Sequence, residues 1–338
     1  MILDRWQRPL GHLRISITDR CNLRCAYCMP EADYVWLPKT TLLTFEELTR
    51  VTRLFTELGV RNVRLTGGEP LLRAQVTELT AQLAGIGMLD DLAMTTNGVL
   101  LASQALRLRE AGLTRVTVSL DTLQADRFQS LTRRDHLRDV LAGIDAALEA
   151  FGTVKLDTVL MRGVNDDEIE SLIRFAGEHA AEIRFIEYMD VPGATHWAES
   201  TVVSREEILD RVQQAFGALE TLPADGPAPA SRYRLASGQI FGVIASTTTP
   251  FCSTCDRIRL TADGHLFTCL YATQGLDIRT PLREGASDAD LVALLTETWQ
   301  RRVDRGAESR LTAKDRTAFI PVEDLRRSPQ LEMHTRGG

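Results

Sequence analysis

Residues 13–30 read LRISITDRCNLRCAYCMP, and this segment carries the most informative pattern in the chain. Apolar and polar residues alternate over 13–17, which is the pattern of a half-buried β-strand. Three cysteines follow, Cys21, Cys25 and Cys28, with the spacing C-x3-C-x2-C. They are therefore expected on a loop that leaves the end of a strand, where three thiolates can converge on one metal centre.

Two kinds of metal centre are compatible with three cysteines. A zinc site would need a fourth ligand, usually Cys or His, and no histidine lies between His12 and His136. A four-iron cluster normally has four cysteine ligands, so three would leave one iron open to bind a substrate or cofactor. The spacing favours the cluster, with a zinc site or an unrelated loop as the alternative.

The other three cysteines, Cys252, Cys255 and Cys269, form a second group near the C-terminal end. No cysteine is left over, which favours metal ligation over disulfide bonds in a reducing compartment. Asp263-Gly264 predicts a hairpin turn that can return Cys269 towards the other two. The second group could hold another incomplete cluster, or zinc with His265 as the fourth ligand.

Composition limits the class of protein. The 338 residues suffice for two domains or for one barrel with an appendage, and 44% hydrophobic residues support a large core. The net charge of −7 disfavours nucleic acid or an anionic membrane as a partner, so an anionic ligand would need a local arginine cluster. No segment is apolar enough to cross a bilayer, and the first ten residues lack a signal-peptide core. We therefore expect a cytoplasmic protein.

Strand and helix patterns alternate along the first half of the chain. Further strands are expected at 62–66, 92–96, 115–120, 154–160 and 182–188, and helices at 44–58, 71–83, 101–111, 136–150 and 166–179. This alternation predicts a parallel α/β sheet, which could be an open doubly wound sheet or a partial barrel. Capping boxes are expected at 44–47 and 204–207.

The C-terminal part has a different character. Residues 222–231, LPADGPAPAS, are rich in proline, alanine and glycine and predict a linker. Short strands and a helix near 288–302 follow it. We therefore expect a larger domain over 1–221 and a smaller α+β domain over 232–338.

Polar motifs follow several of the predicted strands. Gly67-Gly68-Glu69-Pro70 follows the second strand, Thr95-Thr96-Asn97-Gly98 ends the third, and Val118-Ser119-Leu120-Asp121 ends the fourth. Each could be an ordinary turn or strand-end cap. In a parallel barrel, however, these ends meet at one face, where active sites lie.

The cysteine spacing and the GGEP segment together resemble the radical S-adenosylmethionine (SAM) superfamily. Over residues 10–338 the chain resembles the GTP 3′,8-cyclases, the radical SAM family that begins molybdenum cofactor biosynthesis. The matching motifs are TDRCNLRCAYCMP, RLTGGEP, TTNG, VSLD, MRGVND, FIEYMD, FCSTCDRIRLTADG and the terminal Gly-Gly. The resemblance implies an α/β fold: a partial (β/α)6 TIM-like barrel followed by a smaller C-terminal α+β domain that binds a cluster.

The resemblance also implies a role for individual residues. Cys21, Cys25 and Cys28 would hold the [4Fe–4S] cluster that binds SAM, and Cys252, Cys255 and Cys269 would hold a second [4Fe–4S] cluster. SAM contacts would come from Tyr27, Gly68, Ser119 and Met189. GTP contacts would come from Arg14, Arg64, Thr95, Lys155, Arg257, Ile258 and Arg259. Catalytic roles would fall to Arg257, Arg259, Gly337 and Gly338, the last two as a tail that enters the active site.

The implied reaction is a rearrangement of GTP. A 5′-deoxyadenosyl radical takes the C3′ hydrogen of the ribose, and the C3′ radical attacks C8 of a guanine held by the open iron of the second cluster. One further electron and a proton complete the product. The implied partners are a flavodoxin- or ferredoxin-like reductant, a downstream pterin-forming enzyme and a second copy of the chain as a homodimer. Arg257 and Arg259 suit a triphosphate, because residues two apart share one face of a strand and Arg binds phosphate bidentately.

Two positions depart from the family pattern. Asp157 stands where asparagine is expected, and Arg336 stands where an apolar residue is expected before the glycines. Two other readings are weaker. A peptide maturase of the same superfamily would carry more C-terminal cysteines, and an electron carrier or zinc ribbon would not need the GGEP segment.

Overall fold

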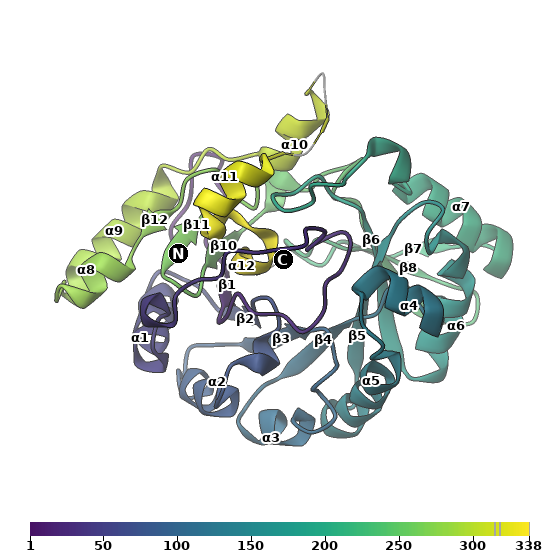
Figure 1. Cartoon of the computed structure of the whole chain (residues 1–338), viewed down its shortest axis with the longest axis horizontal. Helices are drawn as coiled ribbons and strands as arrows, with labels where there is room; N and C mark the ends of the chain where they lie inside the picture. Colours follow the sequence, from purple (N-terminus) through teal and green to yellow (C-terminus); the bar gives the residue numbers. More distant parts are fainter. Residues whose placement is uncertain (314–315, 318, 338) are drawn as a thin grey trace.

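Six parallel strands, each followed by at least one helix, form the centre of the fold (Figure 1). The structure is a computed structural model that describes residues 1–313, 316–317 and 319–337. The central strands are β1 (His12–Ser16), β2 (Asn62–Thr66), β3 (Asp91–Thr96), β4 (Arg115–Ser119), β5 (Val154–Leu160) and β6 (Ala181–Glu187). They pair in this order and in parallel, which confirms the predicted α/β sheet.

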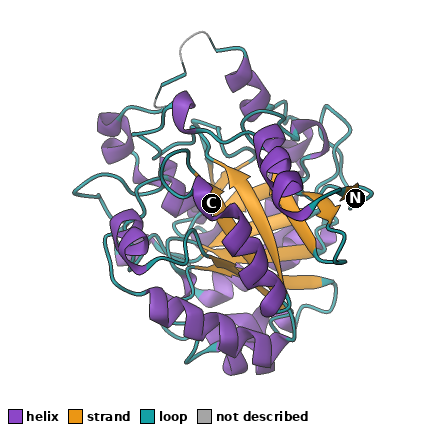
Figure 2. Cartoon of the chain, turned by 90° about the vertical axis from the view of Figure 1, so that its right-hand side faces the viewer, coloured by secondary structure: helices purple, strands orange, loops and turns teal. Residues whose placement is uncertain are grey.

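The helices of this half cover the outer face of the strands, as Figures 1 and 2 show from two sides. They are α1 (Phe45–Glu57), α2 (Val76–Ala84), α3 (Ala105–Glu110), α4 (Ala125–Thr132), α5 (Leu137–Phe151), α6 (Ile169–Glu178) and α7 (Arg205–Phe216). Their buried apolar side chains and those of the outward-facing strand positions form one continuous core.

Three local predictions need correction. The helix expected over 101–111 begins only at Ala105, after turns that follow β3. The helix expected from Leu71 begins only at Val76, because Gln75 has φ 59 and interrupts the helical backbone after a 3-10 turn at Pro70–Leu72. The capping box at Thr44 forms as predicted. At Ser204 only half of the predicted capping box forms. The serine hydroxyl accepts a hydrogen bond from the backbone N–H of Glu207, but the carboxylate of Glu207 pairs with Arg211 of α7 and with Arg162 of the β5–α6 loop.

C-terminal strands extend the sheet at both edges. On one side β9 (Ile240–Ile244) pairs in parallel with β6, and β8 (Ser231–Arg234) and β7 (Glu220–Thr221) follow it. On the other side β10 (Arg257–Leu260) pairs in parallel with β1, and β11 (His265–Phe267) and β12 (Leu276–Asp277) follow. The strand order does not join β9 to β10, so the barrel is partial.

The predicted linker is the loop that connects β7 to β8 within this one sheet. The division into two domains at this loop stays a prediction. The remaining helices are α8 (Arg279–Arg283), α9 (Asp288–Gln300), α10 (Gly306–Leu311), α11 (Val322–Arg327) and α12 (Met333–Arg336). The last of these brings the chain end to the barrel beside β1 (Figure 1). In the described part of the chain, no helix is both long and apolar enough to cross a membrane.

Candidate active site

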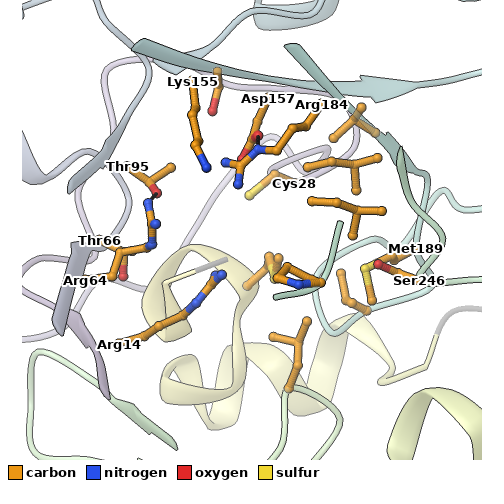
Figure 3. Close-up of a pocket in the computed structure, with 18 of the residues that line it drawn as sticks. Arg14, Cys28, Arg64, Thr66, Thr95, Lys155, Asp157, Arg184, Met189 and Ser246 are labelled. Atoms are coloured by element: carbon orange, nitrogen blue, oxygen red, sulfur yellow. Dashed lines mark hydrogen bonds and ion pairs between the residues drawn. The ribbon is translucent and has the colours of Figure 1, made fainter. Parts of the chain in front are cut away.

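A cavity of about 770 Å³ lies inside the barrel (Figure 3). Alternate residues of the strands point into it, as the twofold repeat of a β-strand requires. The charged and polar ones among them include Arg14, Arg64, Thr95, Lys155, Asp157, Arg184, Arg257 and Arg259. A small parallel barrel is usually filled with branched apolar side chains. Here charged side chains take those positions, so the interior is polar and open to a ligand.

Three arginines form a row across neighbouring strands. Arg14 of β1 is in register with Arg259 of β10 on one side and with Arg64 of β2 on the other. Burial lowers the pKa of Arg14 and of Arg64 well below the usual value, and the neighbouring arginines lower both further. Burial and then Arg257 lower the pKa of Arg259 to about 10. Such a concentration of buried positive charge favours an anionic ligand.

The opposite side of the cavity carries charges of both signs. Asp157, which stands where asparagine was expected, accepts a hydrogen bond from Nε of Arg184 at 2.7 Å. The two side chains form an ion pair. The Nζ of Lys155 lies 3.6 Å from Glu182. Arg184 and Arg115 line the cavity but were not singled out in the sequence, where a lone arginine in a strand is indistinguishable from a solvent-facing one.

The first three cysteines lie where β1 leaves the barrel, and all of them line the cavity. Burial raises the pKa of Cys25 well above the usual value, and the nearby charges of Asp121, Cys21 and Cys28 raise it further. The three thiols therefore lie close enough to influence one another electrostatically. The amide of Asn97 lies 3.8 Å from the Cys21 sulfur and donates to the side chain of Asn22 at 2.7 Å.

The GGEP segment packs directly on this cysteine loop. A Cβ at Gly68 would lie 2.3 Å from the carbonyl oxygen of Arg20, so only glycine permits this approach. The buried Glu69 accepts hydrogen bonds from the backbone of Leu71 and Asn97 and from the hydroxyl of Thr96. Burial raises the pKa of Glu69 to about 7. Glu69 thereby joins the loops that follow β2 and β3.

The other residues expected to contact SAM lie at the same end of the barrel. Tyr27, Ser119 and Met189 all line the cavity. The hydroxyl of Tyr27 donates to Asp121 at 2.8 Å, and burial raises the pKa of Asp121 to about 6. The structure thus brings together all four positions, from four different loops or strands.

The second group of cysteines lies beside Arg257. Burial raises the pKa of Cys269 and of Cys252, and the charge of a neighbouring cysteine contributes to each shift. Burial alone would also raise the pKa of Cys255, but Arg257 and Arg302 lower it to about 6. Backbone N–H groups at the start of α10 point at the sulfurs of Cys252 and Cys269. Hydrogen-bond donors around thiolates are typical of iron–sulfur sites.

The zinc alternatives would need a fourth ligand beside each cysteine group. Within the described ranges, no three His, Cys, Asp or Glu side chains are grouped as ligands of a single metal ion. The Nδ1 of His265 lies 3.1 Å from Asp263, and β11 ends at Phe267, before Cys269. In a four-iron cluster each cysteine binds a different iron, so its three cysteines need not share one ion. Three cysteines at the first group are what the incomplete [4Fe–4S] cluster of the radical SAM superfamily requires.

The C-terminal tail enters the same region. The carbonyl oxygen of Gly337 accepts a hydrogen bond from Arg259. Arg336 is buried; its guanidinium stacks on Phe267 at 4.1 Å and donates to the carbonyl oxygen of Leu270 at 2.7 Å. This stacking explains how arginine occupies a position where an apolar residue was expected. Gly338 lies outside the described residues.

One residue expected to contact GTP does not face the cavity. The side chain of Ile258 is fully buried in the core, because it alternates with Arg257 and Arg259 on β10. Any contact from this position to a ligand in the cavity would have to involve its backbone.

The fold and the cysteine-bearing loop define a radical SAM protein. A family model described as Radical SAM superfamily matches residues 15–176, and one described as Molybdenum Cofactor Synthesis C matches residues 181–308. Curated relatives include GTP 3′,8-cyclase 1 of Mycobacterium tuberculosis, 51% identical over 342 residues that cover all of this chain and 95% of the relative. The GTP 3′,8-cyclase of Acidothermus cellulolyticus is 49% identical over 93% of this chain and 90% of its own. The chain belongs to the GTP 3′,8-cyclase family.

Solved structures agree with this assignment at the level of the fold. SuiB of Streptococcus suis bound to S-adenosylmethionine aligns with a TM-score of 0.60 and 15% identity, over 91% of this chain and 71% of that one. The native protein anSMEcpe with bound AdoMet aligns with a TM-score of 0.54 and 14% identity, over 91% and 88%. Membership of the radical SAM superfamily implies SAM and one [4Fe–4S] cluster.

Proposed function

We propose that this chain is a radical SAM GTP 3′,8-cyclase, which converts GTP to (8S)-3′,8-cyclo-7,8-dihydroguanosine 5′-triphosphate in the first step of molybdenum cofactor biosynthesis. The observation that carries this proposal is one cavity lined by arginines and by Cys21, Cys25 and Cys28, with the second cysteine group outside its lining but adjacent in sequence to the lining residues Phe251, Asp256 and Leu270. A triphosphate needs the arginines, and two incomplete clusters leave one open iron for SAM and one for the substrate.

Cys21, Cys25 and Cys28 would hold the first cluster, and Tyr27, Gly68, Ser119 and Met189 would form the SAM pocket. When bound, the cluster and SAM supply a 5′-deoxyadenosyl radical that removes the C3′ hydrogen of GTP. The close approach of Gly68 to the cysteine loop and the buried Glu69 hold this pocket in a fixed shape. The barrel wall and the C-terminal tail would enclose the reacting atoms, which would protect the chain from side reactions.

The triphosphate would bind in the cationic half of the cavity. Arg14, Arg64 and Arg259 form a continuous row there, and Thr95 accepts from Arg64 at 3.0 Å, which fixes the direction of its guanidinium. Lys155 lies on the facing strand β5. Arg257 and the backbone of Ile258 would place the guanine next to the second cluster.

Cys252, Cys255 and Cys269 would hold that second [4Fe–4S] cluster, which would supply an iron without a cysteine ligand for binding the guanine. Arg257 and Arg259 line the cavity and would supply positive charge to the bound nucleotide. Gly337 and Gly338 would close the cavity over the substrate. The contact from Arg259 to Gly337 links this closure to the cation row.

The proposed partners follow from the same reaction. An external flavodoxin- or ferredoxin-like donor would supply electrons, a pterin-forming enzyme would take up the product, and two copies of the chain would associate as a homodimer.

The proposal is tested first by the iron and sulfide content of protein purified without oxygen and reconstituted. We expect about eight irons per chain, four for each cluster, and GTP-dependent formation of the cyclised product with SAM and a reductant. About four irons together with one zinc would remove the second cluster and the proposed mode of guanine binding. SAM cleavage without any product from GTP would overturn the cyclase assignment.

A further inference from the structure

Arg302, two residues after the end of helix α9, contacts the second cysteine group. Its side chain is 1% exposed. Its Nη1 donates to the carbonyl oxygen of Cys255 at 2.7 Å, and its Nη2 donates to the sulfur of Cys255 at 3.3 Å. Among the residues that the structure describes, no other side chain donates to a sulfur of this group; the other donors are backbone N–H groups.

The position of this guanidinium is fixed by the N-terminal segment. The buried carboxylate of Asp4 lies 3.5 Å from Nη1 of Arg302 and 2.6 Å from Nε of Arg8. The guanidinium of Arg302 also stacks on Trp299 at 4.5 Å, and the indole N–H of Trp299 donates to the carbonyl oxygen of Arg8. Figure 1 shows the N-terminus beside β10 and β11, which is consistent with these contacts.

The acids near Arg302 neutralise its positive charge only in part, so the guanidinium can stabilise negative charge on a cluster. Two buried arginines share the Asp4 carboxylate, and the next acid, Asp304, lies 4.0 Å from Nε of Arg302. That Nε has no hydrogen-bond partner within the described residues. A positive charge with an N–H···S bond stabilises a thiolate-bound cluster more when the cluster gains an electron. Burial strengthens this effect, because little water screens the charge.

We propose that Arg302, held by Asp4, is a positioning residue of the second cluster that raises its reduction potential through the Cys255 sulfur. This inference rests on the proposed function, since it requires a [4Fe–4S] cluster on Cys252, Cys255 and Cys269. Hydrogen bonds to cluster sulfurs are among the main determinants of the potentials of such clusters.

Arg8 provides an internal comparison. It is equally buried and pairs with the same carboxylate, but its Nη1 donates to the carbonyl oxygen of Cys252 and to no sulfur. Loss of Arg8 therefore tests the effect of disturbing the Asp4 pair, whereas loss of Arg302 also removes the N–H···S bond.

The test is a redox titration of the reconstituted enzyme with dithionite, followed by electron paramagnetic resonance. A variant with serine at Cys21, Cys25 and Cys28 serves only to assign the signal of the second cluster. We expect Arg302→Gln to lower the equilibrium constant for one-electron reduction of the second cluster about tenfold. This corresponds to a shift of its potential by about 59 mV to a more negative value. The potential of the first cluster should not change. Arg302→Lys keeps the positive charge but loses the paired contact with the carbonyl oxygen and the sulfur of Cys255. Its second cluster should have a potential between those of Arg302→Gln and of the unmodified enzyme.

Two controls separate the N–H···S bond from other effects. Arg301→Gln makes the same charge change one residue away, where the side chain is 74% exposed and pairs with Glu297; it should shift neither potential. Arg8→Gln should shift the second potential less than Arg302→Gln does.

Three results would overturn the inference. An unchanged second potential in Arg302→Gln would show that the contact has no redox effect. Loss of the second cluster alone, with the first intact, would make Arg302 an assembly residue instead. Zinc in place of the second cluster in the unmodified enzyme would overturn the proposed function, and this inference with it, before any variant is compared.

Discussion

Arg259 of β10 donates a hydrogen bond to the backbone carbonyl of Gly337, the penultimate residue of the chain. Arg259 is at the same level of the sheet as Arg14, so the chain end meets the row of cations inside the barrel. The tail therefore completes the wall of the cavity and, at the same time, restrains one of its arginines.

Gly337→Ala should reduce cyclisation at least tenfold. Gly337 has φ 68, and a Cβ there would lie 1.8 Å from Oγ1 of Thr66, so alanine must displace the tail. The left-handed conformation alone costs a non-glycine residue about 1–2 kcal/mol, and about 1.4 kcal/mol corresponds to tenfold. SAM affinity should stay within twofold. Product formed from GTP and SAM binding are measured on the same preparation.

Gly152→Ala is the matched control for this substitution. Gly152 has a similar φ of 75, but no atom lies within 4 Å of the added Cβ. It should lower the thermal midpoint and leave cyclisation unchanged. Equal cyclisation by both variants would show that docking of the tail is not required.

Asp157→Asn should tighten GTP binding about fivefold. Asp157 places a negative charge inside the cavity, and its removal relieves repulsion of the triphosphate, worth about 1 kcal/mol at an effective dielectric constant near 20 with partial screening. Asparagine can still accept from Arg184, so the arginine keeps its position. Equilibrium binding of GTP measures the change, with the exposed Asp139→Asn as the control. Weaker binding would mean that the carboxylate itself is needed to orient Arg184.

Docking of the tail should weaken below pH 6.5. Burial and then Arg24 lower the pKa of His334 to about 3, and neither ring nitrogen has a hydrogen-bond partner within the described residues. Because this pKa lies below the usual value of about 6.5, the docked state disfavours the charged ring. His334 thus imposes no charging cost on docking above pH 6.5, and between pH 6.5 and the lowered pKa the docking equilibrium constant falls about tenfold for each pH unit.

Hydrogen exchange of the C-terminal peptide, corrected for the intrinsic effect of pH, measures this docking. Protection should decrease from pH 7.5 to pH 5.5 in the unmodified chain. In His334→Phe the aromatic contacts with Tyr34 and Trp36 can persist, and the decrease should disappear. The same pH dependence in both chains would exclude His334 as its cause.

Cys252→Ser should separate the two cysteine groups functionally. The variant should lose about four of about eight irons and retain SAM binding, because the first group is unchanged. It should form no product from GTP. Ser253→Ala, at the adjacent exposed position, should behave as the unmodified enzyme. Full cyclisation by Cys252→Ser would exclude the second cluster from the reaction.

Sequence patterns predicted the features that depend on residues close together in the chain, such as strand bounds and the residues that share one face of a strand. The bounds of β2 and β5 agree with the expected ranges, because alternation of apolar and polar residues is strong there. The shared face of Arg257 and Arg259 also follows from strand periodicity. Local patterns could not place Arg184 in the cavity, since only curvature of the sheet turns that face inward. The contact of Asp4 with Arg302 joins opposite ends of the chain and leaves no local signal.

The pairing of β1 with β10 has a consequence for how the chain folds during synthesis. His12 pairs with Arg257, so one edge of the first strand lacks its partner until most of the chain has been made. At about 5–20 residues per second, the ribosome needs roughly 12–50 s to reach that partner. The nascent chain thus carries an exposed strand edge and three unligated thiols for this period. Any factor that binds the nascent chain in this period meets a barrel that is still open at β1.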